Sequence, residues 1–259
     1  MDLKLAGRTV LVTGASKGIG LAIAQWFARE GCKLRLAARS KDLLEGEAAA
    51  IRKASSVEVQ VFALDLSQEA GRKRLTDACP EVDVLVNNAG DIPAGSLEDV
   101  DNAAWRAGWD LKVFGYVGLT RHYLAKMKAR RRGVIINIIG TAGERPIPVY
   151  LAGSMGNASL MSFTVALGAA SPEHGVRVLG VNPGPVLTDR VVKISRKRAL
   201  SMLGSEERYT ELLKKNPFGR PASVDEIAAT VVFLASDRSS YTSGTIVTID
   251  GGFSKRAAV

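Results

Sequence analysis

The sequence predicts an α/β fold, a doubly wound parallel sheet with helices on both faces. Short apolar runs rich in β-branched residues alternate along the chain with longer stretches of helical length and periodicity. Several of the short runs, such as residues 10–12 (VLV) and 134–136 (VII), are apolar without interruption. Such strands are typical of a parallel sheet that is covered by helices on both faces.

The expected strands follow from these short runs and their turn-forming neighbours. They cover residues 9–13, 33–37, 58–63, 84–87, 133–138, 177–181 and 245–249. Repeated β–α alternation implies right-handed crossovers, and in sheets of this type ligands bind at the carboxyl ends of the strands.

The expected helices cover residues 19–30, 41–54, 68–78, 102–129, 149–170 and 224–235. Ser223 and Glu226 stand three residues apart at the start of the last one, which is the pattern of a capping box. A chain of 259 residues without a linker, repeat or low-complexity tract is expected to form a single domain over residues 1–259.

Composition excludes several classes of protein. The sequence has no run of about 18 apolar residues, so we expect no membrane span. It also has no apolar run before residue 9, so we expect no cleavable signal. Two cysteines and two histidines fit no metal-binding spacing, so we expect a cytoplasmic protein without a metal site. The net charge of +9 indicates either a solubilising surface or attraction for anions, while no nucleic-acid-binding motif is present.

A glycine-rich loop follows the first expected strand directly. Residues 14–20 read Gly14-Ala15-Ser16-Lys17-Gly18-Ile19-Gly20 and lead into a helix. Glycines allow the backbone to turn tightly and to approach a pyrophosphate, to which the helix N-terminus presents free N–H groups. The loop therefore predicts a dinucleotide site.

Further motifs follow in a fixed order. They are Asp65-Leu66 after the third strand, Asn87-Asn88-Ala89-Gly90 after the fourth, Tyr150 opening a helix, residues 182–188 (NPGPVLT) after the sixth strand, and residues 250–252 (DGG). Together with the glycine loop they resemble the short-chain dehydrogenase/reductase family over nearly all of residues 5–253. The resemblance implies a Rossmann fold that binds a nicotinamide dinucleotide.

The resemblance also implies where the cofactor lies. Asp65 and Leu66 would lie near the adenine, and Asn88, Ala89 and Gly90 around the adenosine ribose. The nicotinamide end would be held by Pro183, Gly184, Val186 and Thr188. For Asn87 we favour a structural role, as a tie between neighbouring strands.

The end of the second strand predicts the choice of cofactor. An enzyme that prefers NAD(H) usually carries an acidic residue there, to bind the ribose 2′-hydroxyl. Here the strand ends in Ala38 and Arg39, and Lys17 lies in the first loop. Two cations without a carboxylate favour the 2′-phosphate of NADP(H) over NAD(H), although both side chains also fit a solvated surface.

The family's catalytic positions are altered. Tyr150 matches the proton-transferring tyrosine, but Ser154 stands where a lysine is expected four residues later. Gly140, beside Thr141, stands at the position of the family's substrate-orienting serine, and Lys112 replaces an asparagine. A tyrosine with its ordinary pKa of about 10 is a poor base at neutral pH, so these losses predict low activity unless they are compensated.

One lysine is gained close to the place where one is lost. By the resemblance, the long side chain of Lys112 could project its ammonium into the space left by the small Ser154, and thereby serve Tyr150 from another helix. Thr141 could supply the missing hydroxyl. In the alternative interpretation Lys112 points to solvent.

Three functions therefore remain open. The first is an NADP(H)-dependent oxidoreductase acting on a small carbonyl or secondary-alcohol substrate, and the second is a catalytically inactive NADP-binding sensor or scaffold. The third, a lyase with a structural cofactor, has no positive support in the sequence. Eight basic residues in the expected substrate lid, residues 189–216, suit either an anionic substrate or a solvated helix face. The resemblance also implies a homotetramer or dimer.

Overall fold

One parallel sheet forms the centre of the computed structural model, which describes residues 1–256. Its seven strands lie in the order β3-β2-β1-β4-β5-β6-β7, and every neighbouring pair is parallel. The strands are β1 (Thr9–Thr13), β2 (Lys33–Ala38), β3 (Val59–Ala63), β4 (Val84–Asn87), β5 (Gly133–Ile138), β6 (Val176–Pro183) and β7 (Ile246–Ile249). The doubly wound Rossmann fold predicted from the sequence is confirmed.

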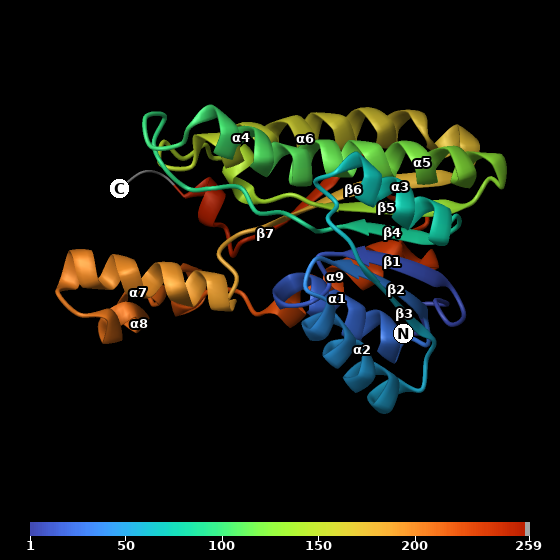
Figure 1. Cartoon of the computed structure of the whole chain (residues 1–259), viewed down its shortest axis with the longest axis horizontal. Coiled ribbons are helices and arrows are strands. Elements are labelled where there is room, and N and C mark those ends of the chain that lie inside the picture. Colours follow the sequence, from blue (N-terminus) through green and yellow to red (C-terminus); the bar gives the residue numbers. More distant parts are fainter. Residues whose placement is uncertain (257–259) are drawn as a thin grey trace.

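Helices cover both faces of the sheet (Figure 1). One layer contains α1 (Gly18–Arg29), α2 (Lys41–Ser55) and α9 (Val224–Ala235), and the other contains α3 (Glu69–Ala78), α4 (Asn102–Trp109), α5 (Gly115–Ala129) and α6 (Leu151–Ala170). Two further helices, α7 (Asp189–Leu203) and α8 (Tyr209–Leu213), project away from both layers. Within residues 1–256, no helix has the length and apolar character needed to cross a membrane.

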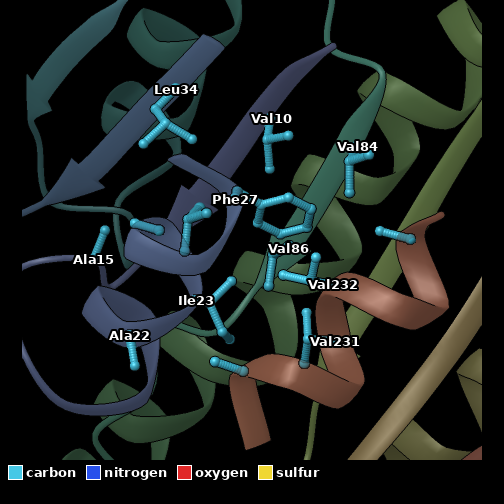
Figure 2. Close-up of a cluster of buried hydrophobic side chains, with 14 of the residues drawn as sticks. Val10, Ala15, Ala22, Ile23, Phe27, Leu34, Val84, Val86, Val231 and Val232 are labelled. Atoms are coloured by element: carbon cyan, nitrogen blue, oxygen red, sulfur yellow. The ribbon is translucent and has the colours of Figure 1, made fainter. Parts of the chain in front are cut away.

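Alternate residues of the central strands pack on opposite faces of the sheet. Val10 and Val12 belong to the core beneath α1 and α9, whereas Leu11 between them belongs to the core beneath α3 and α5. Burying each such side chain contributes roughly 1.5–3 kcal/mol, so both layers are held firmly to the sheet. Figure 2 shows the first core, in which strand residues Val10, Val84 and Val86 meet Ile23, Phe27, Val231 and Val232.

The prediction of a single helix over residues 102–129 is wrong in one respect. The helix is interrupted between α4 and α5 by a π-helical segment, Asp110–Phe114, which carries Lys112. A π-helical segment widens the helix locally and often marks a functional site. Since apolar periodicity does not distinguish π from α geometry over so few residues, the sequence pattern did not predict the interruption.

The sheet order places the functional site. The chain leaves β1 for β2 and β3 on one side and then returns to β4 on the other, so β1 and β4 are neighbours at the point where the direction of winding reverses. Loops from their carboxyl ends separate there and leave a crevice.

At the start of α9 the predicted capping box is confirmed, with Ser223 Oγ accepting from the Glu226 N–H and the Glu226 carboxylate accepting from the Ser223 N–H.

Candidate functional site

A cavity of about 950 Å³ lies at the carboxyl ends of the strands. Its walls come from the loops after strands β1 to β6, from the π-helical segment and from the first turns of α7. The volume is in the range of cofactor sites in proteins. The predicted cofactor residues that line it are Gly14, Ser16, Lys17, Gly18, Ile19, Gly20, Arg39, Leu66, Asn88, Ala89, Gly90, Pro183, Gly184, Val186 and Thr188.

The first loop is shaped for close backbone approach. Gly18 has φ of +58°, a conformation that favours glycine. A Cβ at Gly20 would lie 2.3 Å from the carbonyl oxygen of Gly14, so no larger residue fits there. Helix α1 has no acidic residue in its first turn and no side-chain cap, which leaves its N-terminal N–H groups available to an anion. These features fit a dinucleotide pyrophosphate.

The two asparagines after β4 support the walls of the site. Asn88 Nδ2 donates to the carbonyl oxygens of Thr13 and Gly14 at 2.9 and 3.2 Å, and thereby joins the loops after β1 and β4. Asn87 Nδ2 donates to Asn137 Oδ1 at 2.9 Å, which confirms that Asn87 ties neighbouring strands together.

Asp65 does not line the cavity, in contrast to its neighbour Leu66. Asp65 is exposed, and its Oδ1 accepts hydrogen bonds from the backbone N–H and the hydroxyl of Ser67. An aspartate in this position stabilises the turn that precedes α3. Leu66 therefore lines the cavity, whereas the Asp65 carboxylate is directed into the turn.

Two acidic residues, Asp91 and Asp189, line the cavity, and the sequence pattern singled out neither of them for this role. Asp91 follows the motif after β4, and its Oδ2 lies 3.7 Å from Nη2 of Arg39, at the end of β2. Arg39 is 62% exposed and Lys17 lines the same cavity, so both cations remain accessible to an anion. The end of β2 itself carries no carboxylate, as predicted.

Tyr150 lines the cavity from the N-cap position of α6. Burial raises the pKa of its phenol, the guanidinium of Arg190 lowers it, and the Asp91 carboxylate raises it. The tyrosine ring lies over the first turn of the helix, where a Cβ at Gly153 would approach its Cζ to 2.0 Å. Gly153 thus makes room for the Tyr150 side chain of its own helix.

Lys112 enters the same cavity from the π-helical segment. Its Nζ donates a 2.6 Å hydrogen bond to the carbonyl oxygen of Ile139, just beyond β5. The aliphatic part packs against Gly90, where a Cβ would lie 2.9 Å from Lys112 Cδ. Burial, and secondarily the charge of Arg190, lowers the pKa of Lys112 to about 8. The interpretation that Lys112 points to solvent is therefore wrong.

Thr141 and Ser154 do not join this group. Within residues 1–256, neither lines the cavity. Ser154 is buried, and its Oγ accepts a 3.0 Å hydrogen bond from the backbone N–H of Ile147. Thr141 begins a short 3₁₀ turn after Gly140. The hydroxyl of Ser154 supports the short loop between β5 and Tyr150, and the structure does not place the hydroxyl of Thr141 where Gly140 lacks one.

Arg190 also lines the cavity, although the sequence did not identify it as a site residue. Its Nη1 donates to Asp91 Oδ1 at 3.1 Å and its Nη2 to the carbonyl oxygen of Ile92 at 3.0 Å. These bonds connect the start of α7 to the loop after β4. The sequence showed only that residues 189–216 are basic, and it contained no signal that distinguished Arg190 from the other cations.

Comparison with known proteins defines the class. The family model described as enoyl-(acyl carrier protein) reductase matches residues 14–254. The NADP-dependent (R)-specific alcohol dehydrogenase of Lentilactobacillus kefiri is 34% identical over 98% of this chain and 99% of its own. The crystal structure of L-sorbose reductase from Gluconobacter frateurii complexed with NADPH and L-sorbose superposes with a TM-score of 0.93, at 30% identity, over 99% of this chain and 100% of that one. The chain belongs to the short-chain dehydrogenase/reductase family.

Proposed function

We propose that this protein is an NADP(H)-dependent oxidoreductase that interconverts a carbonyl compound and a secondary alcohol. The observation that carries the proposal is that Tyr150 and Lys112 line the same cavity as the dinucleotide-binding loop after β1. A proton-transferring hydroxyl, a cation and a cofactor site are thereby available in one place.

The two cations near the end of β2 support NADP(H) over NAD(H). Arg39 and Lys17 would hold the 2′-phosphate, and charge-assisted hydrogen bonds of this kind are the stronger ones in proteins. The alcohol dehydrogenase of Lentilactobacillus kefiri is described as NADP-dependent, and the sorbose reductase was crystallised with NADPH. Both relatives agree with this preference.

When bound in the cavity, NADPH would be the source of the hydride for the carbonyl carbon of the substrate. The Tyr150 hydroxyl donates its proton to the carbonyl oxygen, so that the product is a secondary alcohol and the tyrosine becomes a phenolate. The Lys112 ammonium, at the end of β5, stabilises this negative charge. With a pKa of about 8, Lys112 is mostly protonated at neutral pH and still releases a proton readily. It thus takes the role of the family's missing helix lysine.

One observation favours the alternative function, a cofactor-binding sensor or scaffold without turnover. Neither Thr141 nor Ser154 lines the cavity, so the side chains proposed for the site include no hydroxyl in place of the family's serine. Loss of one donor to the reacting oxygen typically costs about 10²–10³ in rate. If the protein is an enzyme, it should retain a reduced rate of turnover that depends on Lys112. A sensor should show no turnover.

The experiment that tests the function measures NADPH binding and then NADPH oxidation in the presence of ketones, diketones, quinones and acyl thioesters. Turnover that disappears in Tyr150→Phe, while NADPH binding is kept, is the expected result. Binding without any turnover supports the sensor instead. Absence of NADPH binding contradicts both functions.

Assembly and organisation belong to the same proposal. Apolar side chains are exposed along α6 and at the start of α5, including Met155, Val165 and Phe114, and they suit a homodimer or homotetramer. We also propose one catalytic domain in the cytoplasm, with residues 189–216 as a lid over the substrate. Light scattering of the purified chain measures the number of subunits.

A further inference from the structure

We propose that Arg190 is a positioning residue, carried by α7, that supplies a second cation to Tyr150 and Lys112 when α7 is docked against the loop after β4. The inference rests on the proposed function, because it concerns the same proton-transferring group. It goes beyond the proposed function because it makes the acidity of the Tyr150 hydroxyl depend on the position of α7.

The contacts of Arg190 fix its guanidinium at the cavity. Two hydrogen bonds, to the Asp91 carboxylate and to the Ile92 carbonyl, join it to the loop after β4. Arg190 lies one residue into α7, which begins at Asp189 after the N-cap Thr188, whose side chain accepts from the Val191 N–H. A capped helix start and two bonds to the opposite wall hold one cation in a defined place.

The charge of Arg190 acts on both members of the proposed proton-transfer pair. It lowers the pKa of the Tyr150 phenol, against burial and Asp91, and it lowers the pKa of Lys112 in the same direction as burial. Because Arg190 is 49% exposed, water weakens these effects. The other charged groups that line the cavity are Lys17, Arg39, Asp91, Asp189 and Lys193. Tyr116 is buried, and its hydroxyl donates a hydrogen bond to the Ile138 carbonyl.

This arrangement differs from the one that the family resemblance led us to expect. In the arrangement that the resemblance implies, the cation belongs to the same helix as the tyrosine and is always present. Here Lys112 comes from the segment before α5 and Arg190 from α7, which projects away from the helical layers (Figure 1). Tyr150 would be a weaker acid if α7 left this position, because the second cation would leave with it.

The test uses Arg190→Gln and Arg190→Lys, with Lys197→Gln as a matched control. Lys197 is exposed on the same helix and does not line the cavity, so its replacement changes the net charge equally. The first readout is the phenolate absorbance of Tyr150, obtained as the difference between each protein and the same protein with Tyr150→Phe. This titration needs no turnover, so it remains decisive even if the proposed enzyme activity is not found.

In Arg190→Gln, we expect Tyr150 to titrate at higher pH than in the wild type and in Lys197→Gln. Arg190→Lys should restore much of the difference. If turnover is present, kcat/KM at neutral pH should fall in Arg190→Gln, and its pH profile should move to higher pH. A Tyr150 titration that is the same in Arg190→Gln and in the wild type overturns the inference.

Discussion

Lys112 donates a hydrogen bond of 2.6 Å to the carbonyl oxygen of Ile139, and this bond holds an ammonium at the end of β5. The family resemblance placed an asparagine at this position and a lysine at Ser154. Ser154 instead accepts a hydrogen bond from the loop that leads to Tyr150, so it is engaged in supporting that loop. We therefore propose Lys112, which lines the same cavity as Tyr150, as the relocated cation.

Burial of Lys112 should cost stability. Its pKa falls from the usual 10.5 to about 8, which corresponds to about 3 kcal/mol against the protonated folded state. Lys112→Met keeps the unbranched shape and most of the length of the side chain, and removes the charge. We expect it to raise the free energy of unfolding at pH 7 by about 1–3 kcal/mol, as measured by urea denaturation.

The pH dependence checks the cause of this gain. Between pH 8 and pH 10.5 the unfolded state holds the Lys112 proton more tightly than the folded state, so the stability of the wild type should rise with pH. The advantage of Lys112→Met should therefore shrink across this range. An advantage that is constant with pH would show that better packing, and not the buried charge, stabilises the variant.

Arg39 should determine the preference for the 2′-phosphate. In Arg39→Gln, we expect NADPH to bind about 10- to 100-fold more weakly, because one charge-assisted contact is lost, while NADH binding is nearly unchanged. Fluorescence titration with both cofactors measures the two affinities. Lys33→Gln is the control, because Lys33 is exposed at the opposite end of the same strand. Equal weakening of NADPH and NADH would contradict this role.

Gly153 should be required for the placement of Tyr150. A methyl group in Gly153→Ala would approach the tyrosine ring to 2.0 Å, so the ring has to move. We expect turnover to fall about 100-fold, since small displacements of a reacting group have effects of this size, while NADPH binding is retained. Gly46→Ala, in α2 with open space around its Cβ, should leave turnover unchanged.

Gly140 should not accept the family's serine. Its φ of +134° and ψ of +144° are open essentially to glycine alone. Gly140→Ser should therefore destabilise the fold by about 1–3 kcal/mol and should not increase turnover. Thermal unfolding and the NADPH oxidation rate are the measurements. A more active and equally stable Gly140→Ser variant would show that only the hydroxyl is missing.

The fold and the outline of the cofactor site could be predicted from the sequence because their signals are local. Uninterrupted apolar runs predict buried parallel strands, and the glycine loop between β1 and α1 predicts a phosphate-binding turn. Ser223 and Glu226 likewise specify their cap within four residues.

The remainder of the site depends on directions that side chains take in three dimensions. The π-helical segment directs Lys112 towards Ile139, and hydrogen bonds to Asp91 and Ile92 bring Arg190 over the cavity. Thr141 and Ser154 have suitable chemistry close to Tyr150 in sequence, yet neither lines the cavity. Residue type and spacing do not determine these directions, because tertiary contacts decide them.

If Lys112 replaces the helix lysine, Lys112→Ala should oxidise NADPH far more slowly than the wild type. The comparison includes the wild type and Lys126→Ala, an exposed lysine on α5. We expect Lys112→Ala to keep its fold and to bind NADPH but to lose turnover by at least about 100-fold, while Lys126→Ala is unaffected. Turnover by Lys112→Ala at the wild-type rate would show that Lys112 does not replace the helix lysine.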